Sequence, residues 1–166
     1  RIIKGMVGRE MDNRYPAHTS NTGAEILRVE NWTAHHPDDK NRVVVDKVNI
    51  NVKKGEIVGI AGIMGAGRTE FARSLFGRSW GTNISGKVFI NGKEADVSTI
   101  RKAIDAGLAY ATEDRKRFGL NLIDDIKRNI SMASLHTFVK RGLVSDNEEF
   151  KVASSYRESM NIKAPS

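Results

Sequence analysis

The sequence predicts an α/β fold in which a glycine-rich loop joins a buried strand to a helix. Residues 57–61 form an apolar run without alternation, as in a strand buried on both faces of a parallel sheet. Glycines follow at positions 62, 65 and 67, and apolar residues at 71, 72, 75 and 76 then fall on one stripe of a helix. Strands and helices alternate downstream, which is the order typical of α/β proteins.

Two strands are expected before the loop. Residues 25–30 and 43–52 are rich in apolar and β-branched residues and flank a polar loop over 35–41. We expect these two strands to pair in one antiparallel sheet. Residues 1–24 are polar, contain several turn-forming residues and show no periodicity, so we expect a linker or arm there.

Several elements are expected after the loop. The predicted helix ends at Gly77, a residue type that commonly closes helices. A strand over 86–91 follows, because the Asn91-Gly92 pair behind it favours a tight turn. We expect a partly helical region from Asp124. The remaining elements are a helix over about 97–105, a strand over 108–112 and a helix over about 146–160.

The composition excludes several classes of protein. The chain has 166 residues, the size of one domain, and 39% of them are hydrophobic. It contains no cysteine, so disulfides, thiolate catalysis and zinc–thiolate sites are excluded. The longest nearly uncharged apolar stretch, residues 57–67, has eleven residues, against roughly 20 for a membrane-spanning helix.

The charge balance is basic, with 27 basic and 20 acidic residues and a formal net charge of +7. Such a balance invites a nucleic-acid-binding interpretation. The basic residues are scattered, however, and the densest run, residues 115–117, directly follows the acidic pair Glu113 and Asp114. A nucleic-acid-binding protein concentrates its charge on one face or helix. We therefore interpret the charge as a basic surface.

The glycine-rich stretch over 62–69 fits the phosphate-binding loop G-x-x-x-x-G-K-S/T at every fixed position except the lysine, which is Arg68. Glycines let the backbone curl so that consecutive N–H groups point inward, and the following helix adds its positive N-terminal end. A hydroxyl at Thr69 can bind Mg²⁺ beside the phosphates. The candidate phosphate-binding residues are Gly62, Gly65, Ala66, Gly67, Arg68 and Thr69.

Two other interpretations of this stretch are weaker. A dinucleotide-binding turn needs an acidic residue about 20 positions on, and residues 82–85 contain none. A purely structural glycine turn would only allow the helix to pack closely against the strand. Because arginine is longer than lysine, planar and always charged, we expect Arg68 to hold phosphate in a different place. That placement is compatible with binding but unfavourable for fast hydrolysis.

Beyond the loop, the sequence resembles a known family over nearly its whole length. The resemblance is carried by residues 6–10, 52–62, 64–70 and 113–117. These segments are similar to the ATP-binding subunits of ABC transporters that import monosaccharides, of the xylose, ribose or galactose type and the multiple-monosaccharide type. Arginine in place of the loop lysine is typical of the second of the two nucleotide-binding domains fused in those subunits. The chain thus resembles the N-terminal half of that second domain.

The resemblance implies a P-loop, ABC-type nucleotide-binding domain of the α/β class with a small antiparallel β subdomain, which binds ATP and Mg²⁺. Carried over by position, residues 62–69 are its Walker A loop, and Glu113 stands where the family has the glutamine of the Q-loop. Thr69 and Glu113 are therefore the implied metal ligands. The family stacks adenine on an aromatic residue after the first strand. The loop over 33–42 offers only His35 and His36 for that contact, and His36 is the candidate. A plain exposed loop is the simpler interpretation.

The resemblance also implies how the chain is organised. Residues 25–166 are expected to be a partial, truncated nucleotide-binding domain that ends before the signature motif, and residues 1–24 an arm from a preceding domain. In the family, ATP lies between two such domains, and transmembrane permease subunits are the other partners, with no nucleic acid among them. The subunits lie in the cytoplasm on the inner face of the cell membrane. We expect the 166 residues alone to be inactive as an ATPase.

Three functional hypotheses follow from the sequence. The first is an ATP-binding component of a sugar importer, which couples ATP binding and hydrolysis to monosaccharide uptake. The second is a degenerate, non-hydrolytic regulatory or assembly domain, favoured by Arg68 and Glu113. The third is a nucleic-acid-binding domain, which only the net charge suggests.

Overall fold

The computed structural model describes residues 21–140 and 142–163, and it divides into two compact units, Arg1–Tyr110 and Ala111–Ser166. The expected arm over 1–24 lies outside the described residues except for positions 21–24. The same holds for the segment 6–10 that contributes to the family resemblance.

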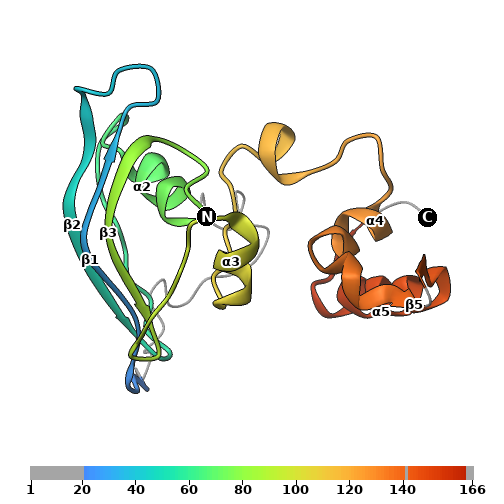
Figure 1. Cartoon of the computed structure of the whole chain (residues 1–166). Coiled ribbons are helices and arrows are strands. Elements are labelled where there is room, and N and C mark those ends of the chain that lie inside the picture. Colours follow the sequence, from blue (N-terminus) through green and yellow to red (C-terminus); the bar gives the residue numbers. More distant parts are fainter. Residues whose placement is uncertain (1–20, 141, 164–166) are drawn as a thin grey trace, which may run out of the picture. The chain divides into compact units, whose positions relative to one another are not determined.

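The first unit is built on an antiparallel sheet of four strands in the order β2-β1-β3-β4 (Figure 1). The pairing of β1 with β2 confirms the predicted antiparallel pair, and β3 contains most of the strand predicted over 86–91. Asn91 and Gly92 have φ angles of 50° and 77°, as in the tight hairpin turn predicted there. The strands are β1 (Glu25–His35), β2 (Val43–Lys53), β3 (Thr82–Ile90) and β4 (Lys93–Glu94).

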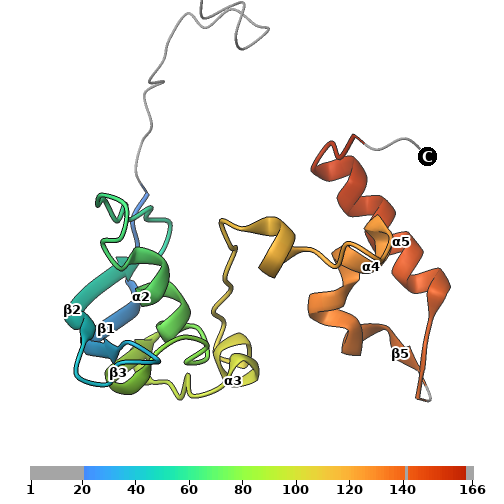
Figure 2. The ribbon, with the colours of Figure 1, turned by 90° about the horizontal axis from the view of Figure 1, so that it is seen from above.

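Two helices belong to this unit. Helix α2 (Arg68–Leu75) begins directly after the glycine-rich loop, as predicted, and lies along one face of the sheet (Figures 1 and 2). Helix α3 (Ile100–Asp105) begins later than predicted. The reason is local, because the Thr99 side chain accepts the backbone N–H of Lys102 at 3.3 Å and caps the helix there.

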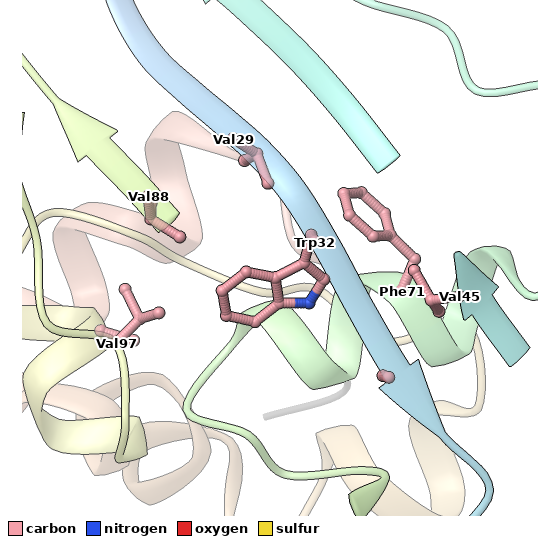
Figure 3. Packing of buried hydrophobic residues seen from close by; sticks show 8 residues of the cluster. Val29, Trp32, Val45, Phe71, Val88 and Val97 are labelled. Atoms are coloured by element: carbon pink, nitrogen blue, oxygen red, sulfur yellow. The ribbon is translucent and has the colours of Figure 1, made fainter. Parts of the chain in front are cut away.

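The core of the first unit lies between the sheet and α2. Trp32 is at its centre and is only 1% exposed. Figure 3 shows the Trp32 ring with Val88 and Val97 on one side and Phe71 and Val45 on the other. Because these side chains come from three strands, from α2 and from the segment before α3, one apolar cluster joins all the parts of the unit.

A buried hydrogen bond fastens α2 to the sheet. The indole Nε1–H of Trp32, on β1, donates to Ser74 Oγ on α2 at 3.0 Å, and Ser74 is fully buried. The Ser74 hydroxyl in turn donates to the carbonyl of Phe71 at 2.8 Å. Both polar groups are thereby satisfied inside the core, which is the condition for burying them without a large penalty.

The predicted strands over 57–61 and 108–112 are wrong, because neither segment has the backbone pairing of a strand. Ile57 is 94% exposed, although the prediction placed it in a buried strand. Val58, Ile60 and Tyr110 line one apolar pocket of about 240 Å³. No strand of the described residues occupies that pocket, so the two segments lack the neighbours that an inner parallel strand requires.

The second unit is mainly helical, which confirms the helical region predicted from Asp124. Its long helix coincides with the one predicted over 146–160. No helix in the described part of the chain is long and apolar enough to cross a membrane. The elements of the unit are η1 (Arg115–Gly119), α4 (Ile126–Ser131), η2 (Met132–Phe138), β5 (Val139–Lys140), β6 (Leu143–Val144) and α5 (Asp146–Ser159).

A buried polar cluster joins α4 to α5. Glu149, on α5, is 4% exposed and accepts a hydrogen bond from the Ser131 hydroxyl on α4. Lys127 Nζ lies 3.5 Å from Glu149 Oε2 and also donates to the Asp146 carboxylate. The bond from Lys127 lowers the pKa of Asp146 and, from the other side, raises the pKa of Lys127. The buried charge of Glu149 is thus paired and hydrogen-bonded.

The first prediction concerns the bond between Trp32 and Ser74. Ser74→Ala removes the acceptor and leaves a buried indole N–H unpaired, so we expect the free energy of unfolding of the first unit to fall by about 1–3 kcal/mol. In a Trp32→Phe background the same substitution should cost much less, because no donor remains. Urea unfolding of the four variants measures the difference. An equal cost in both backgrounds would show that the bond does not stabilise the unit.

The second prediction concerns acid stability of the second unit. The folded pKa of Asp146 lies below its ordinary value of 3.8, so its ion pair stabilises the fold above that pH and is lost as the pH falls through the lower, folded value. Asp146→Asn should therefore destabilise the unit at neutral pH, and this effect should shrink as the pH is lowered to about 2. Urea unfolding at both pH values measures this.

The matched control for that experiment is Asp46→Asn, because Asp46 is exposed and has no hydrogen bond or ion pair with another described residue. This variant should unfold like the wild-type chain at both pH values. A destabilisation by Asp146→Asn that stayed constant with pH would contradict a role for the ionised carboxylate.

Candidate functional site

The glycine-rich loop leads directly into α2. The backbone N–H of Ala66 donates to the carbonyl of Ile63 at 3.1 Å and closes a turn within the loop. Gly67 is the N-cap of α2, and the first helical bond runs from the N–H of Phe71 to its carbonyl at 2.8 Å. No side chain caps the helix at this end. The first N–H groups of a helix have no acceptor within it, so the backbone N–H groups of Arg68 and Glu70 can donate to an anion.

The loop is curled so tightly that a side chain at two of its positions would meet close neighbours. A Cβ added to Gly62 would lie 2.9 Å from the Cβ of Ala66, on the opposite side of the turn. A Cβ added to Gly67 would lie 3.1 Å from the carbonyl oxygen of Val44 on β2, and Gly67 also has a φ of 79°. Glycine at both positions thus lets the loop close on itself and lets β2 approach the start of α2.

Arg68 is exposed and folds back over the loop. Its Nη2 donates to the carbonyl of Ile63 at 3.3 Å, so the guanidinium stays beside the loop. That bond uses one of the five N–H donors of the side chain. Because Arg68 also lies at the positive end of α2, its charge and the helix dipole reinforce each other. An anion bound here would be attracted by both.

The two expected metal ligands lie in different units. Thr69 is partly buried in the first turn of α2, whereas Glu113 is exposed and belongs to the second unit. Among the described residues, no three His, Asp or Glu side chains are gathered in a way that could hold a metal ion. Next to Glu113, the Asp114 carboxylate accepts the backbone N–H of Arg117 at 3.1 Å and caps η1. The pairing of Thr69 with Glu113 stays a prediction.

His36 directly follows β1 and is partly buried, whereas residues 37–42 after it are exposed, as the simpler interpretation of that loop expected. Its ring meets the ring of Trp80 edge to face, with centroids 6.0 Å apart. Its Nδ1 accepts the backbone N–H of Asp38 at 3.2 Å. Trp80 was not predicted as a site residue, because it follows α2 in a short turn without periodicity. The contact with adenine stays a prediction.

The chain matches known proteins over most of its length. The family model described as ABC transporter matches residues 45–164. The chain is 50% identical over its full length to the L-arabinose transport ATP-binding protein of Geobacillus stearothermophilus, of which it covers 32%. It is 38% identical over 99% of its length to the xylose import ATP-binding protein of Thermoanaerobacter pseudethanolicus, again covering 32% of that protein. For the Escherichia coli xylose import ATP-binding protein, the identity is 44% over 82% of the chain and 26% of that protein.

These relatives are longer than the chain, which spans about a third of the first two. The region matched by the family model begins within β2 and contains the glycine-rich loop, α2 and the elements that follow. The match confirms the predicted α/β, ABC-type class of domain. The family model matches more than two thirds of the chain, and the curled loop precedes α2 as an ABC-type domain requires. The chain therefore belongs to the ABC transporter family.

Proposed function

We propose that the chain is the ATP-binding part of a subunit that powers the import of a pentose or a related monosaccharide. The observation that carries the proposal is the loop over 62–67, which curls on itself and presents the uncapped N-terminus of α2. The names of the arabinose and xylose relatives support the substrate class. In the longer protein, ATP hydrolysis would drive the uptake, with permease subunits and a second nucleotide-binding domain as partners at the cytoplasmic face of the membrane.

Within such a subunit, we assign the chain to the second nucleotide-binding domain. Arg68 in place of the loop lysine supports this assignment. Residues 25–166 would then be one part of that domain, and residues 1–24 would connect it to the domain before it.

The loop residues fit the phosphates of ATP. The N–H groups at the start of α2 and the remaining donors of Arg68 are complementary to phosphate oxygens. Mg²⁺, when bound, would neutralise part of the phosphate charge, and the hydroxyl of Thr69 and the carboxylate of Glu113 are the ligands we propose for it. His36 is the residue that we propose for the adenine ring. It lies near the end of β1, beside Trp80.

A second function is favoured by a specific observation. The guanidinium of Arg68 is bonded to the loop carbonyl of Ile63, where a lysine would extend as a point charge towards the phosphates. Such an arrangement suits a domain that binds nucleotide and stabilises an assembly without hydrolysing ATP quickly. The two functions share the same binding site and differ only in turnover.

The third prediction tests anion binding by the loop. Pyrophosphate should shift the backbone amide signals of residues 65–69 in a saturable way, because their N–H groups lie at the start of α2. Gly67→Ala should weaken this binding, since the added Cβ would meet the Val44 carbonyl at 3.1 Å. Heteronuclear NMR titration measures both.

The matched control is Gly92→Ala. Gly92 has a φ of 77°, close to that of Gly67, but nothing lies within 4 Å of its added Cβ. This variant should bind pyrophosphate like the wild-type chain. Two results would show that the loop is not the pyrophosphate site. One is amide signal shifts spread over the whole basic surface, and the other is binding that Gly67→Ala does not weaken.

The fourth prediction tests the role of Arg68. If its guanidinium contacts phosphate, Arg68→Ala should raise the dissociation constant for Mg-ATP about ten- to a hundred-fold, the value of a charge-assisted hydrogen bond. Arg68→Lys should retain or improve binding, because it restores the point charge. Arg101→Ala, an exposed arginine on α3, is the control. Calorimetry on the four proteins measures the affinities, and equal affinities throughout would mean that the backbone N–H groups act without Arg68.

A further inference from the structure

A second pocket lies in the first unit, outside the glycine-rich loop. Its volume is about 300 Å³, at the lower end of the roughly 300–1,000 Å³ typical of small-molecule sites. We call it the β3–β4 pocket, because most of its lining comes from β3, β4 and the residues that follow. The side chains that determine its chemistry are Trp32, Arg78, Lys87, Glu94, Asp96 and Val97.

The charged side chains of the pocket are balanced in sign. Lys87 and Glu94 form an ion pair at 3.0 Å, and Asp96 pairs with Lys102 at 2.6 Å. Arg78, in contrast, has no hydrogen bond or ion pair with any other residue that the structure describes. Its backbone has a φ of 50°, which is unusual for a side chain of this size and fixes the direction in which Arg78 leaves the chain.

This balance selects the kind of ligand. A small anion would be repelled by Glu94 and Asp96, and a metal cation by Arg78 and Lys87. A zwitterion would have to break the existing ion pairs to use their charges. Hydroxyl groups, in contrast, both donate and accept hydrogen bonds. They can donate to the free lone pairs of the carboxylates and accept from the free N–H groups of Arg78.

We propose that the β3–β4 pocket binds a small, neutral, hydroxyl-rich ligand of the monosaccharide class. The volume suits a single sugar ring and is too small for a nucleotide. The volume and charge of the pocket do not depend on the nucleotide site, whereas the choice of pentoses as probes rests on the proposed function. The fluorescence of Trp32 is expected to change when a ligand binds in the pocket, because Trp32 lines it. Trp32 also donates to Ser74 of α2.

The experiment is a titration of the full 166-residue chain with L-arabinose and D-xylose. Trp32 and Trp80 are the two tryptophans, so a Trp80→Phe variant makes Trp32 the sole fluorescent reporter. Amide shifts of residues 86–97 in the wild-type chain give the same readout without that substitution. We expect a saturable response to at least one pentose in the millimolar range, and no saturable response to alanine or inorganic phosphate.

Two variants and a control locate the binding. Arg78→Gln and Glu94→Gln should each weaken pentose binding about ten-fold, because each removes a charged hydrogen-bond partner of the sugar. Arg101→Gln lies outside the pocket, on α3, and should leave the affinity unchanged. Both pocket residues are at the surface, so their substitution is compatible with folding.

The proposal is overturned if neither pentose gives a saturable response, if alanine or phosphate binds in place of the sugars, or if Arg78→Gln and Glu94→Gln bind as the wild type does. Titration of the same samples with Mg-ATP separates this failure from failure of the proposed function. Binding of ATP without binding of a pentose would contradict only the proposal for the β3–β4 pocket. Binding of a pentose without binding of ATP would contradict only the proposed nucleotide site.

Discussion

The hydrogen bond between the Trp32 indole and the Ser74 hydroxyl holds α2 against the sheet, and the place of the glycine-rich loop depends on it. Helix α2 has only eight residues, too few to be stable on its own, so its position depends on what it packs against. The bond fixes the last turn of α2 on β1, and the ring of Phe71 fills the adjoining core. The start of α2, and with it the glycine-rich loop, is consequently held at one place relative to the sheet.

From that fixed helix the properties of the loop follow. The chain turns sharply into α2, where Gly67 lies against the carbonyl of Val44. The loop before it is closed by the bond from Ala66 to Ile63, and Gly62 lies against Ala66. The result is a helix N-terminus without a side-chain cap, next to a guanidinium. Both are electropositive, so a phosphate is the group that would complete the arrangement.

The features that were predicted correctly depend on residues close to one another along the chain. The antiparallel pair, α2, the turn at Asn91-Gly92 and the long helix α5 all carry a local periodicity or a specific turn residue. The spacing of the loop glycines is likewise local. The predicted strands over 57–61 and 108–112 were wrong because a parallel strand forms only between neighbours, and an apolar run does not say whether they are present. The contact of His36 with Trp80 was missed because the two residues are far apart in the sequence, and the residues around each of them do not indicate it.

The central claim is that the phosphate-binding ability of the loop depends on the position of α2 against the sheet. The most direct measurement compares amide hydrogen exchange in residues 68–75 and Mg-ATP affinity between the wild-type chain and Ser74→Ala, under conditions where both are folded. If the claim holds, Ser74→Ala exchanges faster in α2 and binds ATP more weakly than the wild type. Faster exchange with unchanged ATP affinity would contradict it, because the loop would then bind phosphate wherever the helix lay.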